Sequence, residues 1–129
     1  MKKIWILSVF GLALAACSPG PQVSFVEPAE GAVVSGEFKV VMAVQGMQVM
    51  PAGEVVENAG HHHLLIDVEP IAAGEPVPND EQHLHFGKGQ TETTLTLTPG
   101  KHTLSLQFAD GAHISYGEKL RSTITVRVE

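Results

Sequence analysis

Hydrophobic and polar residues alternate along several short stretches of the chain, and proline, glycine or asparagine closes most of them. The clearest case is residues 37–45, where Phe38, Val40 and Met42 share one face. A period of two is typical of a β-strand with one buried face. Residues 120–128 repeat this pattern at the C-terminal end. The same criteria predict further strands at residues 23–26, 61–68, 83–86, 91–98 and 102–108.

Beyond the N-terminal segment, no stretch has helical periodicity long enough to compete with these strands. Turn signals such as Pro99-Gly100 and Asp110-Gly111 separate them. Many short strands with turns between them are typical of two packed sheets. The predicted fold class is therefore all-β, an immunoglobulin-like antiparallel β-sandwich of about seven strands over residues 22–129.

The N-terminal segment has the organisation of an export signal. Lys2 and Lys3 precede an apolar run, residues 4–13, that is too short for a stable membrane span. Residues 14–17, Leu-Ala-Ala-Cys, resemble the lipobox of bacterial lipoproteins, which are cut before the cysteine and acylated on it. We expect residues 1–16 to be a lipoprotein signal peptide and residues 17–21 to be the lipidated Cys17 with a tether. The alternative is an ordinary secretory peptide with a chance cysteine.

This interpretation assigns the only cysteine to lipid attachment, so the membrane is the first expected partner. Ser18, rather than an aspartate, follows Cys17. By resemblance this favours the outer membrane, facing the periplasm, in a Gram-negative source. Loss of two lysines with the leader would change the formal net charge from −6 to −8. A domain with this negative charge is not expected to bind nucleic acid. We also expect the protein to be a monomer.

Histidines supply the candidate chemistry. Three of the seven are consecutive, His61 to His63, at the head of an apolar run, and His83-Leu84-His85 follows about twenty residues later. On a strand, a His-x-His pair points both rings to one side. Imidazole is the commonest metal ligand in proteins and suits Zn, Cu, Fe and Ni. We therefore predict a transition-metal site whose ligands are His61, His63, His83 and His85.

Two further residues extend the predicted site. Asp67 shares the strand face of His61 and His63, and it could bind the metal or orient a ring. Met47 lies on an irregular segment before the histidine strand and could be a soft ligand for copper. Core filling is the commoner use of methionine. The expected cofactor is copper ahead of zinc, and the expected role is metal storage, buffering or delivery, with an unknown protein partner for transfer.

The competing interpretation is a metal-free envelope interaction module whose histidines form a structural polar layer. On this view His62 and His102, which fall on apolar strand faces, are hydrogen-bonded core residues. His113 is a solvated loop residue, unless it closes a site at the sandwich edge. An enzyme is not expected, because the chain has no Gly-x-Ser-x-Gly motif, no free cysteine nucleophile and no phosphate-binding glycine loop.

Several motifs also resemble a bacterial family called domain of unknown function 4399. The likeness covers roughly residues 40–128, and its most specific parts are the two histidine motifs. It implies a small exported domain and carries over no function, so the metal prediction depends on the residues themselves. The matching motifs are Gly46-Met47, Pro51-Ala52-Gly53 and the segments 60–67, 83–92 and 99–104.

Overall fold

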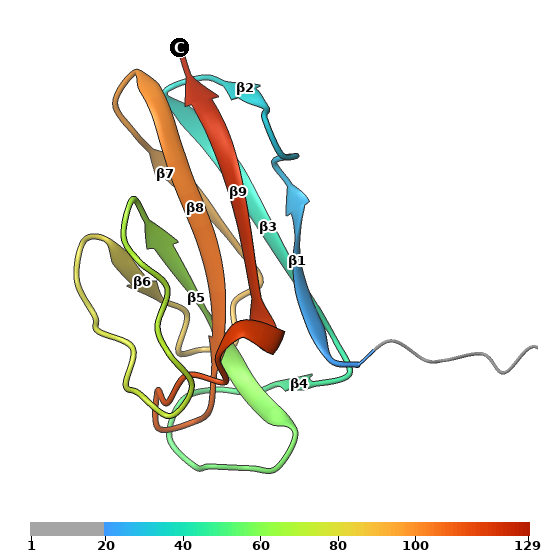
Figure 1. Cartoon of the computed structure of the whole chain (residues 1–129). Coiled ribbons are helices and arrows are strands. Elements are labelled where there is room, and N and C mark those ends of the chain that lie inside the picture. Colours follow the sequence, from blue (N-terminus) through green and yellow to red (C-terminus); the bar gives the residue numbers. More distant parts are fainter. Residues whose placement is uncertain (1–19) are drawn as a thin grey trace, which may run out of the picture.

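The computed structural model describes residues 20–129, which form two packed β-sheets (Figure 1). One sheet has three strands, in the order β1 (Gln22–Glu27), β3 (Glu37–Gln45) and β7 (Glu92–Thr96). The second sheet contains β2 (Val33–Val34), β9 (Arg121–Val128), β8 (Gly100–Ala109), β5 (Ala59–Ile66) and β4 (Gln48–Val49) in that order. β6 (His83–His85) also pairs with β5, and a 3-10 turn, η1 (Glu118–Leu120), leads into β9.

The predicted all-β sandwich is confirmed, and seven of the strands have three residues or more. Most strand pairs are antiparallel, and two short pairings, β2 with β9 and β4 with β5, are parallel. β2 and β4 have only two residues each, too few to show alternation in a sequence. The predicted leader and Cys17 lie outside the described residues. Within residues 20–129, no helix is long and apolar enough to cross a membrane.

The main core lies between the two sheets. In β3 the side chains of Phe38, Val40 and Met42 are buried while Glu37 and Lys39 are exposed, as the alternation predicts. Phe38, Val40 and Met42 pack against residues of the facing sheet and form one hydrophobic cluster with them. Burying each large apolar side chain contributes about 1.5–3 kcal/mol. The fully buried members from the facing sheet and the turn before β9 are Leu64, Leu104, Leu106, Phe108, Leu120 and Val126.

Strand β5 is buried on both faces, and this decides the environment of its histidines. All eight of its residues are buried. Leu64 and Ile66 point into the main core, as predicted. On the other face, Leu65 packs with Val77 of the long loop after β5 and with Ala109 at the end of β8. His61, His62 and His63 are therefore all enclosed, with at most 1% of their surface exposed.

Candidate metal centre

Three segments bring four histidines together at one end of the six-stranded sheet. His61 and His63 come from β5, on the face covered by the long loop. His85 comes from β6, where the antiparallel register places it directly opposite His63. His113 lies in the loop after β8, whose last residue, Ala109, pairs with His61. We call His61, His63, His85 and His113 the histidine quartet.

The quartet has the geometry of a metal-binding group. Each residue can offer one ring nitrogen such that all four nitrogens lie within 4.8 Å of one another. The six distances between ring centroids range from 4.6 to 5.8 Å. His61 Nε2 lies 3.1 Å from His113 Nδ1. Zinc–nitrogen bonds measure about 2.0–2.1 Å, so small ring movements would allow the quartet to hold a metal ion.

Local backbone structure positions the loop that carries His113. Asp110 Oδ1 accepts hydrogen bonds from the N–H groups of Ala112 and Ile114, and the N–H of His113 donates to Asp110 O. His113 itself has a φ of 66°, a left-handed conformation that is uncommon for a residue with a side chain. These bonds hold the tight turn that directs His113 back toward β5.

Two glycines leave the space that the quartet needs. A Cβ atom on Gly87 would collide with the ring of His85, so the observed position of that ring requires glycine at residue 87. A Cβ atom on Gly111 would collide with the backbone of Glu54. The loop of Gly111 therefore docks closely on the segment before β5, where the N–H of Gly53 donates to Gly111 O.

Burial favours the neutral form of three members of the quartet, His61, His63 and His85. Desolvation by burial, aided by the neighbouring histidines, lowers the pKa of His61 to about 4 and that of His63 to about 3. The same two causes lower the pKa of His85. A histidine binds metal through an unprotonated nitrogen. These residues are therefore in the ligand form at neutral pH without the loss of a proton.

Three ring nitrogens of the quartet are buried and have no hydrogen-bond partner among the described residues: His61 Nδ1, His63 Nδ1 and His85 Nε2. A buried polar group without a partner costs about 1–3 kcal/mol. Each such group in a folded protein calls for an explanation, and one possible explanation is a bound ion. In a purely structural histidine layer, we would expect the ring nitrogens to be hydrogen-bonded. Within the quartet, only His61 Nε2 and His113 Nδ1 form such a pair.

Comparison with known proteins places the chain in a family. Residues 40–129 match the family described as Domain of unknown function (DUF4399), and this stretch includes the whole quartet. The chain belongs to that family. No curated protein and no solved structure matches it.

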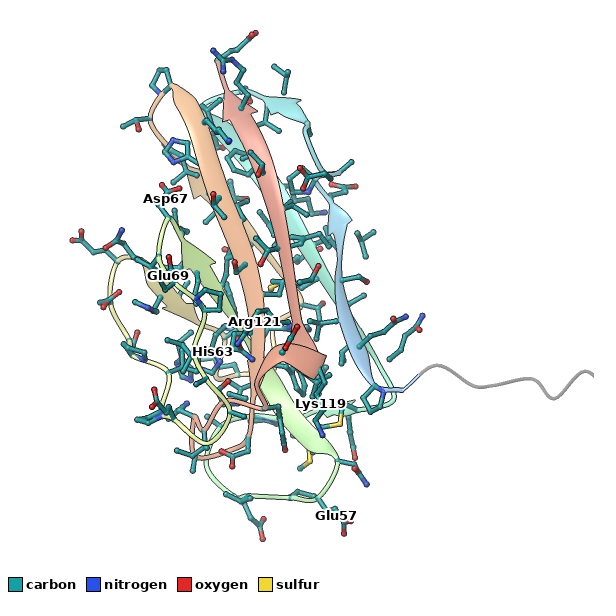
Figure 2. The ribbon with its side chains drawn as sticks, viewed as in Figure 1. Glu57, His63, Asp67, Glu69, Lys119 and Arg121 are labelled. Atoms are coloured by element: carbon teal, nitrogen blue, oxygen red, sulfur yellow. The ribbon has the colours of Figure 1, made fainter. Side chains whose placement is uncertain are left out.

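Two of the predicted ligands lie elsewhere in this DUF4399 domain. His83 is on the same strand as His85, but its Nδ1 lies 2.7 Å from Asp80 Oδ1, and that pairing holds it outside the quartet. Asp67 follows β5 with a φ of 56°, and its carboxylate contacts His102 Nδ1 and the N–H of Thr103. Figure 2 shows Asp67 and His63 well apart along β5.

Met47 is also outside the quartet, and His113 takes the fourth place. Met47 packs against the main core, which is the commoner use of methionine. His113 had only a weak signal in the sequence, because nothing local shows that an Asp-Gly turn folds back onto β5. Knowledge of the β5–β8 register would have been needed to find it.

The two histidines expected in the core have different environments. His102 is hydrogen-bonded as expected, to Asp67 and to Thr98 O. The expectation for His62 is wrong, because neither of its ring nitrogens has a partner within residues 20–129. Its ring packs edge-to-face on Phe108, with 5.2 Å between centroids. Its position on the core face of β5 leaves no polar neighbour within reach.

Proposed function

We propose that this DUF4399 domain binds one transition-metal ion through the histidine quartet and serves in metal storage, buffering or delivery. One observation carries the proposal: four histidine nitrogens lie within 4.8 Å of one another, and three ring nitrogens of the same residues are buried without a partner. Because the group contains only imidazoles, it suits borderline metals rather than magnesium or calcium.

Copper ahead of zinc is the preferred order. Divalent first-row metals bind a given nitrogen site with affinities that peak at Cu²⁺, above Zn²⁺. Met47 no longer supports Cu(I), because it packs in the core. Binding rather than catalysis is proposed, since the quartet contains no carboxylate to act as a general base beside the metal.

The cellular setting is also a proposal, and it depends on the sequence pattern. The leader and Cys17 support a lipoprotein anchored in the outer membrane and facing the periplasm. A monomer that receives or donates metal through an unidentified protein partner would fit this setting. The acidic charge argues against nucleic acid as a partner.

Calorimetric titration of the protein without a histidine tag tests the proposal. Cu(II) and Zn(II) should each bind at one ion per chain, copper more tightly, and each should raise the melting temperature, because an ion that binds only the folded state stabilises it. His85→Ala should abolish this response. His83→Ala is the matched control on the same strand and should leave the response intact. A flat titration with a cooperative melt would end the metal proposal.

A further inference from the structure

A small cavity adjoins the quartet on one side. Its volume is about 160 Å³, and it is lined by His63, Val77, Asn79, His85 and His113. His61, the remaining quartet member, is not part of this lining. The cavity therefore extends from the histidines toward the long loop that covers the outer face of β5, from which Val77 and Asn79 come.

This volume exceeds what a metal ion alone requires. A water molecule occupies about 30 Å³ in the liquid, so the cavity has room for an ion and for a further small molecule beside it. Val77 forms a buried wall, with 7% of its surface exposed, whereas Asn79 is exposed. Asn79 thus marks the side from which solvent reaches the cavity.

The charge of the bound metal ion indicates which kind of molecule would enter the cavity. An imidazole binds a metal ion through an unprotonated nitrogen and so brings no negative charge to it. A divalent ion held only by neutral imidazoles would keep its full charge in a largely buried place, and a buried charge is costly unless it is paired. Asp110, in the loop that carries His113, is a nearby carboxylate that could balance this charge. Its carboxylate, however, accepts two backbone hydrogen bonds and lies outside the quartet.

We infer that the quartet's metal takes one small anion as an additional ligand, and that the anion enters through the cavity lined by Val77 and Asn79. This inference rests on the proposed metal binding. The chemical class is an anion of a few non-hydrogen atoms with a nitrogen or oxygen donor. Such a metal centre is open on one side, unlike a closed structural site.

Azide is the probe for this inference. The protein loaded with one equivalent of Cu(II) is titrated with sodium azide, and the azide-to-copper charge-transfer absorption is followed together with the electron paramagnetic resonance spectrum. We expect a saturable change that fits one azide per copper. Cu(II) in the same buffer without protein is the reference for azide binding to free metal.

Two variants connect the anion to the cavity. Asn79→Trp should weaken azide binding at least tenfold and leave copper affinity unchanged, because the bulky ring obstructs the entrance without touching a ligand. Glu81→Trp, an exposed position in the same loop outside the lining, is its control. Val77→Leu fills the cavity from its wall and should weaken azide in the same direction.

The outcomes separate this inference from the proposed function. Copper uptake with no azide response, or azide binding as tight in Asn79→Trp as in the unaltered protein, overturns the inference and leaves metal binding intact. Absence of copper uptake overturns both.

Discussion

Two histidine environments lie at opposite ends of the strand pair β5–β8. Beyond one end, His102 Nδ1 lies 2.6 Å from Asp67 Oδ2, and its Nε2 lies 2.7 Å from Thr98 O. Both ring nitrogens of His102 therefore face acceptors. At the other end, the quartet packs rings against rings, and three buried nitrogens have no partner within the described chain.

The partners decide the charge of each histidine. Hydrogen bonds to Asp67 and Thr98 raise the pKa of His102, because they favour the protonated ring. Burial lowers the pKa of His61 and His63. The same residue type thus gives one ring whose protonated form is stabilised and two rings whose neutral form is favoured. The number of acceptors around a buried ring, rather than the ring itself, separates a structural histidine from a candidate ligand.

The largest expected effect is acid destabilisation caused by the buried histidines. His61 and His62 have folded pKa values of about 4 and His63 of about 3, all below the ordinary 6.5. The unfolded chain therefore binds more protons in this range, and the free energy of unfolding should fall as the pH falls from 6.5 toward 4. Each residue can contribute up to about 1.4 kcal/mol per pH unit. Urea unfolding at several pH values measures the slope, and an unchanged stability over this range would contradict the assigned burial.

The next largest expected effect is a difference in copper affinity between variants of the two histidine environments. His113→Ala removes a member of the quartet and should weaken copper binding by about 100-fold or more, beyond the loss typical of a residue that only orients a ligand. His102→Ala removes a histidine with satisfied nitrogens and should leave copper affinity unchanged. Calorimetry of the two variants measures the contrast. Equal losses in both would show that the quartet is not the binding site.

Much of the sandwich could be predicted because alternation reports burial directly. The alternation predicts the strand at residues 37–45 with its observed bounds, since Phe38 and Val40 point inward while Lys39 points outward. The predicted faces of β5 are also confirmed, with Leu64 and Ile66 in the main core and Leu65 on the other face. What alternation does not show is the point at which a strand ends. The alternation predicts that Asp67 shares the strand face of His63, but β5 ends at Ile66 and the backbone turns at Asp67.

The candidate site could be predicted only in part, for a related reason. His61, His63 and His85 follow from strand periodicity together with one pairing. The exclusion of His83 depends on a contact with Asp80 that is a property of a loop. The inclusion of His113 depends on a turn that crosses back onto β5. Both depend on loop conformation, which hydrophobic patterning does not specify.

His62 offers a test of what an unpartnered buried nitrogen costs when no ligand role explains it. His62→Leu replaces a fully buried ring that packs against Phe108 and has no hydrogen bond within residues 20–129. We expect the free energy of unfolding at neutral pH to rise by about 1–2 kcal/mol and the acid slope to become shallower. Copper affinity should not change, because His62 faces the core. A loss of copper binding in this variant would show that the core face also contributes to the site.

A smaller effect is expected from displacing one ring without removing it. Gly87→Ala places a methyl group where the ring of His85 lies, and a side chain can yield where a backbone cannot. The domain should remain folded while copper affinity falls by about tenfold. Gly36→Ala is the matched control, since its Cβ would lie 4.0 Å from the nearest atom, Leu97 O. Thermal melts and calorimetry on both variants distinguish a displaced ligand from a general loss of stability.

The smallest effect concerns the opposite end of the strand pair and has the opposite pH dependence. The raised pKa of His102 means that its contribution is complete below its unfolded value of about 6.5 and is lost as the pH rises through the folded value. Burial alone would raise the pKa of Asp67, but its bonds to His102 and Thr103 lower it. Its contribution is therefore present above 3.8 and lost as the pH falls through the folded value. His102→Asn should cost about 1 kcal/mol near pH 5.5, a modest figure because the Asp67 side chain is 40% exposed and partly screened by solvent. Urea unfolding should show this difference shrinking toward alkaline pH, and a difference that grows with pH would mean that His102 is neutral in the folded protein.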